Sequence, residues 1–176
     1  MEHIIIGIGS NVGNKLHNIK LAITKLTIKN IVTNIKISNI YESKALLPEN
    51  APDDWDINFY NLAISGLTNY EPANLLKLIK NIEQEVGRVN RGVWSPREID
   101  LDILAYGNKI IQTEQLSIPH KSFLERPFTL LPASEILPNW QYPIKGNFYK
   151  KTLKEIVNSG NINHNICWKV KISIKL

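Results

Sequence analysis

The sequence predicts an α+β fold: a ferredoxin-like β-α-β-β-α-β sandwich in which helices pack on a mainly antiparallel sheet. Two observations lead to this prediction. Four segments have the apolar, β-branched composition of strands, and two others repeat apolar residues at three- and four-residue steps, as one buried helix face does. These six segments follow one another in the order strand, helix, strand, strand, helix, strand.

The first three segments lie before residue 44. Residues 3–9 form a short apolar run that ends at a glycine, a serine and an asparagine, so they predict a strand. Residues 14–26 repeat leucine and isoleucine with helical spacing and predict a helix. Residues 31–43 return to β-type composition, with a break before Tyr41, and predict the second strand.

A long loop separates the second strand from the third. Residues 43–56 contain two prolines and three aspartates, and a loop of this length in a compact domain is usually functional. Residues 57–67 then alternate as a strand, with Phe59 and Asn61 on one face. Residues 71–87 predict the second helix, because a proline stands near the start, where a helix tolerates it, and a glycine stands at the end.

The fourth strand and two helical pieces follow. Residues 98–111 predict a strand whose Gly107-Asn108 turn leads into a short hairpin partner. Residues 122–137 predict two short helical pieces, interrupted by Pro127 and Pro132.

The composition indicates one globular domain. With 176 residues, of which 43% are hydrophobic, the chain can bury a sizeable core. We expect this domain over residues 1–160 and a tail over residues 161–176. Within the tail, residues 166–176 alternate apolar and mostly polar side chains, as an edge strand does, or as the first strand of a following domain does.

The expected location is the cytoplasm, without membrane attachment. The first residues lack a secretory signal pattern, and no apolar run approaches the length of a membrane span. The single cysteine, Cys167, excludes an internal disulfide and fits a reducing compartment.

The charge of the chain favours anionic partners. A net charge of +5 and a pI near 9.2 suit nucleotides, nucleic acids and anionic lipids alike. All four arginines lie between positions 88 and 126, and a planar guanidinium can bind two phosphate oxygens at once. Their clustering favours phosphate binding over plain surface charge.

Three glycines follow the first strand pattern. Gly7, Gly9 and Gly13 superficially suggest a dinucleotide-binding loop, but that fingerprint needs a glycine where Val12 stands. We therefore predict that the three glycines serve turns, in which they supply positive φ angles.

The segment WSPREIDLDIL, residues 94–104, contains the main candidate site. Asp100 and Asp102 are two residues apart, so in a strand both point to one face while the apolar residues around them point to the other. The pair is either a solvated strand face or a metal site. Mg²⁺ commonly takes one or two carboxylates together with phosphate oxygens and water.

Neighbouring side chains favour the metal interpretation. Arg88, Arg97, His120 and Arg126 can all donate to phosphate. A metal combined with arginine clamps is the arrangement that phosphoryl transfer needs. Arg91 has a weaker case, since it stands in the middle of a loop and a solvated position explains it.

For five other side chains, a structural role is an alternative to a functional one. Trp94 is either a core anchor or a lid residue that closes over a ligand. Glu83 is most simply solvated, unless it faces a nucleotide. Phe59 and Phe128 are more often core residues than ligand-stacking ones, and Asn61 needs a hydrogen-bonding partner if it is buried.

Five stretches together resemble a known family. They are GSNVG, FYNLAI, IEQEVGR, WSPREIDLDIL and IPHKSFLERPF. With them the chain resembles 6-hydroxymethyl-7,8-dihydropterin pyrophosphokinase, the folate-pathway enzyme, over roughly residues 3–140. The resemblance implies transfer of the β,γ-diphosphate of ATP to the hydroxymethyl group of the dihydropterin, with release of AMP and with two Mg²⁺ ions. ATP and the dihydropterin are then the expected partners, without nucleic acid.

The resemblance also implies roles for single residues. Asp100 and Asp102 correspond to the metal ligands, and Asp102 is a weak candidate for the base. The residues implied in catalysis are Arg88, Arg97 and Asp102. The ATP-binding positions are Glu83, Arg88, Arg97, His120 and Arg126. The pterin-binding positions are Ser43, Ala45, Phe59, Asn61, Trp94 and Phe128.

The sequence departs from the family pattern in places. The loop after Ser43 lacks a proline that many relatives have. Lys80 replaces a neutral residue, and Gln115 stands where some members have a basic one, so we expect ATP affinity to be redistributed between these two positions. Because the family is often fused to dihydropteroate synthase, the tail at residues 166–176 is expected to lead to such a domain.

A rival class is an RNA-binding module, since sheets with exposed aromatic residues can stack bases. The chain lacks the aromatic strand pattern of such modules. Two aspartates on the ligand face of the sheet would also repel phosphate unless a cation lay between them.

Overall fold

The computed structural model describes residues 1–160, 166–172 and 174. In this part of the chain, a six-stranded sheet has the order β5-β1-β4-β3-β8, and β2 pairs with another part of β4. Every neighbouring pair is antiparallel. The strands of this sheet are β1 (Glu2–Ser10), β2 (Thr33–Ile37), β3 (Tyr41–Ser43), β4 (Phe59–Thr68), β5 (Asp100–Tyr106) and β8 (Cys167–Lys169).

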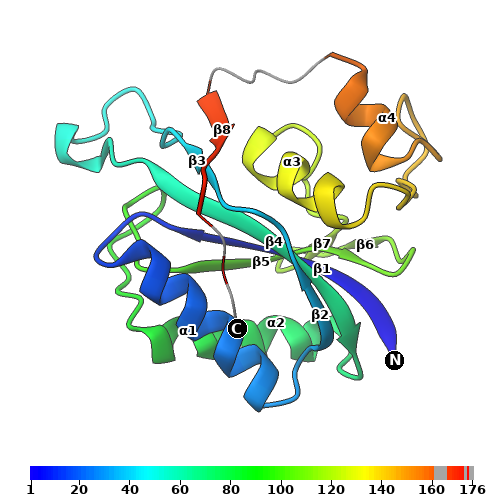
Figure 1. The fold of residues 1–176 in the computed structure, drawn as a ribbon, viewed down its shortest axis with the longest axis horizontal. Coiled ribbons are helices and arrows are strands. Elements are labelled where there is room, and N and C mark those ends of the chain that lie inside the picture. The colour runs from blue at the N-terminus through cyan, green and yellow to red at the C-terminus, as the bar shows by residue number, and fades with distance from the viewer. Residues whose placement is uncertain (161–165, 173, 175–176) are drawn as a thin grey trace.

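Helices cover both faces of the sheet (Figure 1). α1 (Lys15–Ile28) and α2 (Pro72–Val86) lie on one face, and α3 (Pro127–Ile136), with α4 (Leu153–Asn158) beside it, lies on the other. A short 3₁₀ turn, η1 (Asp53–Trp55), lies in the long loop between β3 and β4. The mixed fold with a mainly antiparallel sheet, which the sequence predicts, is confirmed.

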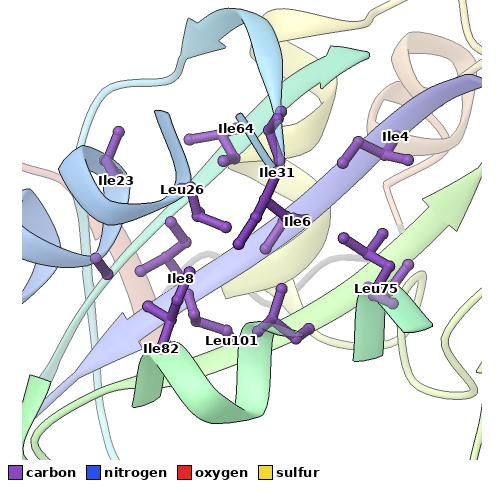
Figure 2. Close-up of a cluster of buried hydrophobic side chains, with 14 of the residues drawn as sticks. Ile4, Ile6, Ile8, Ile23, Leu26, Ile31, Ile64, Leu75, Ile82 and Leu101 are labelled. Atoms are coloured by element: carbon purple, nitrogen blue, oxygen red, sulfur yellow. The ribbon is translucent and has the colours of Figure 1, made fainter. Parts of the chain in front are cut away.

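The alternation of side chains along β1 divides the core into two layers. Ile4, Ile6 and Ile8 are buried among the apolar side chains of α1 and α2, as Figure 2 shows. Ile5 points to the opposite face and joins the smaller cluster under α3. Each fully buried isoleucine contributes roughly 1.5–3 kcal/mol through the burial of apolar surface. This packing fixes β1 between β4 and β5.

Helix α2 begins and ends where its sequence predicts. Pro72 occupies the first turn, where the missing N–H costs nothing. Leu75, Ile79 and Ile82 form the buried face. Gly87 caps the end with a φ of 104°, a conformation that a residue with a Cβ adopts only at a cost. The chain therefore turns sharply at this point into the loop that leads to β5.

The second predicted strand is divided into β2 and β3. The hydroxyl of Ser38 accepts the N–H of Ala63 at 3.0 Å, and the N–H of Ser38 donates to the Ala63 carbonyl. This side chain takes a place that a backbone carbonyl has in a regular ladder, so the pairing with β4 is interrupted there.

The predicted hairpin partner of β5 is wrong. After the turn at Gly107, β6 (Ile111–Gln112) pairs with β7 (Ser117–Ile118) in a separate two-stranded sheet. The free edge of β5 is already used: the N–H of His120 donates to the carbonyl of Leu104, and two side chains of α2 bond Leu101. These bonds occupy the edge of β5 at Leu101 and Leu104, and β6 pairs with β7 instead.

The prediction of two helical pieces at residues 122–137 is also wrong. Pro127 starts the single helix α3, and Pro132 lies inside it. Proline needs no hydrogen bond in the first turn, and one internal proline removes a single helical bond. The remaining turns of α3 are held by Leu130 and Ala133, which are fully buried.

The last part of the described chain adds two elements. Helix α4 was not predicted, although Thr152 and Glu155 form a capping box that marks its start. Cys167–Lys169 pair with β3 at the sheet edge, so the edge-strand interpretation is correct for these three residues. The rest of the predicted alternation includes residues 173 and 175–176, which lie outside the described residues.

Candidate functional site

A cavity of about 640 Å³ opens on the sheet face opposite α1 and α2. Its floor is formed by β1, β4 and β5, and its walls are the loop after β3, the loop between α2 and β5, and the start of α3. The residues that line it are Gly7, Ile8, Gly9, Ser43, Lys44, Leu46, Phe59, Asn61, Arg88, Asn90, Gly92, Val93, Trp94, Arg97, Asp100, Asp102, Arg126, Phe128 and Thr129.

Asp100 and Asp102 both line this cavity, while Leu101 between them is buried against α1 and α2. Asp100 accepts hydrogen bonds from two arginines. Arg88 Nη1 lies 2.7 Å from Asp100 Oδ1, and Arg97 Nη1 lies 3.1 Å from Asp100 Oδ2. The predicted strip of acids and arginines therefore exists as one charged cluster.

Asp102 is less tightly paired than Asp100. Its Oδ1 lies 3.7 Å from Lys80 Nζ, which reaches over from α2. Burial, and after it the charge of Asp100, raise the pKa of Asp102 above the ordinary value of an aspartate. Asp102 therefore binds a proton more readily than an ordinary aspartate does.

Glu83 is buried, so its interpretation as a solvated residue is wrong. One of its oxygens accepts the N–H of Leu101 at 2.7 Å and pairs with Lys80, and the other lies 2.7 Å from Arg88 Nη1. Burial raises the pKa of Glu83 despite these contacts. Glu83 does not line the cavity, and it orients Arg88 and Lys80, which reach toward Asp100 and Asp102.

His120 is half-buried and is not among the residues that line the cavity. Its Nδ1 accepts the N–H of Ser122 at 3.2 Å. Burial lowers its pKa, although the nearby charge of Asp102 acts in the opposite direction. The neutral form is therefore favoured in this position.

Arg97 is held by a residue that sequence reasoning missed. The side-chain oxygen of Asn11 accepts the Arg97 N–H at 2.7 Å, and the N–H groups of Asn11 and Val12 donate to the Arg97 carbonyl at 3.1 and 3.3 Å. Asn11 is 4% exposed. A polar residue directly after the first strand was the available signal.

Two of the three glycines have a role other than the predicted one. Gly13 has a φ of 67° in a turn, as expected, but Gly7 and Gly9 lie inside β1. A Cβ on Gly9 would lie 3.1 Å from Asn61 Oδ1 and would project into the cavity floor. The absence of a side chain leaves this floor open.

The loop between α2 and β5 is closed by an ion pair. Arg91 donates to both oxygens of Glu98, and Glu98 also accepts the N–H of Val89. Trp94 at the tip is 44% exposed and has a φ of 66°, which is unusual for a bulky residue. The core-anchor interpretation of Trp94 is thus wrong, and its ring faces the cavity and Arg126.

The other end of the cavity is aromatic. Phe59 and Phe128 line it, and the Arg126 guanidinium lies 5.8 Å from the centre of the Phe128 ring. Asn61 is buried and donates to Ser43 Oγ at 3.0 Å, so it has the hydrogen-bonding partner that burial requires. Ala45 does not line the cavity, whereas its neighbours Lys44 and Leu46 do.

The donor set fits a hard divalent cation that is bound only in part by the protein. Within residues 1–160, 166–172 and 174, no group of three or more acidic, histidine or cysteine side chains is arranged to enclose a metal ion. Two carboxylates on one strand face leave most ligand positions to phosphate and water, as Mg²⁺ accepts. In the same part of the chain, no helix is both long and apolar enough to cross a bilayer.

Comparisons with known proteins agree with one another. The model of the 7,8-dihydro-6-hydroxymethylpterin-pyrophosphokinase (HPPK) family matches residues 5–138. The 2-amino-4-hydroxy-6-hydroxymethyldihydropteridine pyrophosphokinase of Aquifex aeolicus is 43% identical over 155 residues, which are 88% of this chain and 90% of that protein. The folate synthesis bifunctional protein of Chlamydia muridarum is 38% identical over 156 residues, but this chain covers 34% of its length.

A solved structure is similar in fold. A double variant of the Plasmodium falciparum HPPK-DHPS, crystallised with pterin and p-hydroxybenzoate, superimposes with a TM-score of 0.69 at 16% identity. The match covers 97% of this chain and 47% of that one. This chain therefore spans less than half of the solved bifunctional protein.

Proposed function

Because the chain belongs to the 7,8-dihydro-6-hydroxymethylpterin-pyrophosphokinase family, we propose that it transfers diphosphate from ATP to 6-hydroxymethyl-7,8-dihydropterin in folate biosynthesis. One observation carries this proposal beyond the family match. A single cavity has two carboxylates and two arginines at one end, and two phenylalanines with a buried amide at the other. The first end suits a triphosphate and the second suits a flat, polar ring.

In this reaction the diphosphate passes directly from ATP to the pterin, so no protein side chain needs to form a covalent bond. The hydroxymethyl oxygen attacks the β-phosphorus, the bond from that phosphorus to the oxygen of the α-phosphate breaks, and AMP leaves. The hydroxymethyl proton is lost to a base or to water. Asp102 is the candidate base among the protein side chains. Transfer of this type depends mainly on positioning and on neutralisation of charge.

The arginines provide the neutralisation that comes from the protein. Arg88 and Arg97 point into the cavity from opposite ends of one loop and meet at Asp100. Arg126 lines the cavity, and its guanidinium lies 5.6 Å from the centre of the Trp94 ring and 5.8 Å from that of Phe128. This planar group can bind two oxygens of one phosphate. His120, on which the charges of Asp102 and Arg126 act, would support phosphate binding without lining the cavity. Glu83 acts by positioning Arg88 rather than by contact with ATP.

The pterin end is shaped for a planar heterocycle. Phe59 and Phe128 provide the aromatic faces. Asn61 is held by Ser43, and its carbonyl oxygen, which accepts no hydrogen bond from the part of the chain that the structure describes, can accept one from an amino or ring N–H of the ligand. Trp94 closes the entrance. In place of Ala45, the adjacent Lys44 and Leu46 contribute to this part of the wall.

Asp100 and Asp102 would hold Mg²⁺, with two ions expected. When bound, the metal would supply neutralisation of the charge that develops on the phosphate oxygens. The residues fit this role because both carboxylates line the cavity, and among the described residues no group of three acidic, histidine or cysteine side chains is arranged to enclose the ion, which leaves its remaining coordination positions to phosphate and water.

The wider architecture follows the same proposal. We assign the sheet, with α1 and α2 packed on one of its faces, to the ferredoxin-like β-α-β-β-α-β class, supported by the strand order β5-β1-β4-β3 with every pair antiparallel. We propose residues 1–160 as the pyrophosphokinase domain and residues 161–176 as a tail, of which Cys167–Lys169 add the edge strand β8 to the sheet of the domain. The bifunctional relatives support an association of this tail with dihydropteroate synthase, in the cytoplasm.

The test is formation of AMP from ATP that depends on added 6-hydroxymethyl-7,8-dihydropterin and on Mg²⁺. Asp100→Ala and Asp102→Ala should each lower the rate by roughly 100-fold or more, because each loses a ligand worth several kcal/mol of charge stabilisation. Asp54→Ala, an exposed aspartate in the loop after β3, is the matched control and should keep full activity. Full activity in both site variants would overturn the metal assignment, and absence of AMP from the wild-type protein would overturn the function.

A further inference from the structure

Lys80 places a positive charge beside the acidic pair from a different element. It lies on α2, and its Nζ is 3.7 Å from Asp102 Oδ1 and 4.0 Å from Asp100 Oδ1. Among the ion pairs of the described residues, it is the cation that comes within 4.0 Å of an Asp102 oxygen. The side chain is 39% exposed, so exposure alone would allow the ammonium to turn away from the two aspartates into solvent.

Two further contacts hold the ammonium in this position. Lys80 Nζ donates to the carbonyl of Leu101 at 2.8 Å and to Glu83 Oε1 at 2.7 Å. The same Glu83 oxygen accepts the N–H of Leu101. Lys80 and Glu83 thus take the place of a neighbouring strand at the free edge of β5, at the residue between the two aspartates. Lys80 is for this reason a fixed part of the site and differs from an ordinary surface lysine.

The charges of this cluster balance without a metal ion. The cluster has three carboxylates, Glu83, Asp100 and Asp102, and three cations, Lys80, Arg88 and Arg97. Asp100 is bonded to both arginines, so Lys80 is the charge that compensates Asp102. A divalent cation that binds Asp102 must approach within a few ångströms of this ammonium and is repelled by it.

We propose that Lys80 is a built-in competing cation, which weakens binding of a divalent metal ion to Asp100 and Asp102 while no nucleotide is present. This inference rests on the proposed metal site and adds a residue that sets its affinity. The phosphates of a nucleotide give the ammonium an anion to which it can donate, so the competition ends when metal and triphosphate enter together. Metal binding is thereby tied to the presence of the substrate.

The experiment measures Mn²⁺ binding to the nucleotide-free protein by electron paramagnetic resonance of free Mn²⁺. Lys80→Met removes the charge and keeps most of the side-chain volume. Repulsion between a single and a double charge at this distance, screened by salt in a partly exposed site, corresponds to about tenfold in a binding constant, so this variant should bind Mn²⁺ about tenfold more tightly. Lys80→Gln, which keeps a donor for the Leu101 carbonyl, should bind more tightly in the same way.

Two variants serve as matched controls. Lys80→Arg keeps the charge and should bind Mn²⁺ as weakly as the wild-type protein does. Lys77→Met makes the same change at an exposed position three residues earlier on α2, so it should leave the affinity unaltered. Urea unfolding of each variant shows whether the fold is intact.

The outcomes separate this inference from the proposed function. Equal or weaker Mn²⁺ binding by folded Lys80→Met and Lys80→Gln would overturn the inference, since it would leave Lys80 with a structural role alone. That result concerns metal binding without nucleotide and does not bear on AMP formation, so the proposed function would stand. If Asp102→Ala binds Mn²⁺ as the wild-type protein does, the ion does not bind at the acidic pair, and both the metal assignment and the inference fall.

Discussion

The role of Gly9 in the cavity floor leads to a quantitative prediction. Gly9 lies on β1 opposite Asn61 of β4, and its backbone allows any residue, so Gly9→Ala adds one methyl group without backbone strain. That methyl carbon would lie 3.1 Å from Asn61 Oδ1 and 3.6 Å from a ring carbon of Phe59. Asn61 is buried and tied to Ser43, so it must shift by a few tenths of an ångström.

The cost should fall on binding of the pterin. Displacement of Asn61 loses one hydrogen bond to the ligand, about 0.5–1.5 kcal/mol, and the crowded floor adds about 1 kcal/mol of overpacking. A total of about 2 kcal/mol corresponds to roughly 30-fold weaker binding. The assay is the Kd for a non-reactive pterin analogue, with the affinity for an ATP analogue measured alongside and expected to stay the same.

Gly7→Ala is the matched control for this prediction. Gly7 lies two residues earlier on the same face, but its added methyl would meet Leu104, a fully buried side chain, at 3.3 Å. The atoms nearest to this methyl belong to Leu104 and not to Asn61, so the substitution can lower stability but should change the affinity for the pterin analogue little. Equal Kd values for Gly9→Ala and the wild-type protein, or a larger loss in Gly7→Ala, would refute the reasoning that Gly9 keeps the pterin end open.

Three other predictions concern stability. The hydrogen bonds from Arg91 lower the pKa of Glu98 to about 2, so their stabilising effect is complete above the ordinary carboxyl pKa of 4.5 and is lost as the pH falls toward 2. Urea unfolding should therefore show Glu98→Gln to be less stable than the wild-type protein at pH 7, with the difference disappearing in acid; a difference independent of pH would contradict this. Ile6→Ala should cost about 2–5 kcal/mol of unfolding free energy, because Ile6 of β1 is fully buried against the side chains of α1 and α2. A cost below about 1 kcal/mol would show that neighbouring side chains move to fill the cavity. Thr152→Ala removes the cap of α4, which Glu155 shares, and should cost about 1 kcal/mol in the same assay; an unchanged unfolding midpoint would mean that α4 contributes nothing to the cooperative unit.

Local sequence patterns were sufficient to predict those features of the fold that depend on a single helix or strand. The alternation around Asp100 and Asp102 put both carboxylates on one face, because side chains of a strand alternate whatever lies beside it. The start and end of α2 followed from Pro72 and Gly87, whose backbone preferences are properties of the residues themselves. The same reasoning failed for Pro132, since tertiary packing of α3 outweighs one lost hydrogen bond.

Contacts between distant parts of the chain decided the rest of the site. The Asn11 contact with Arg97 joins residues 86 positions apart, and the Glu83 contact with Leu101 spans 18. Glu83 looked solvated because a single charged residue on a helix usually is, and its burial depends on where α2 lies along the edge of β5.

The sequence by itself determined the alternation of strand and helix segments from β1 to β5, the two faces of β5 and the identity of most charged groups in the cavity. The tertiary structure alone decided how those charges are paired: Asp100 with two arginines, and Asp102 with Lys80. The physical reason is the range of the forces involved. Alternation and capping are set by neighbouring residues, whereas ion pairs form between groups that the packing of α2 against the edge of β5 brings within a few ångströms of each other.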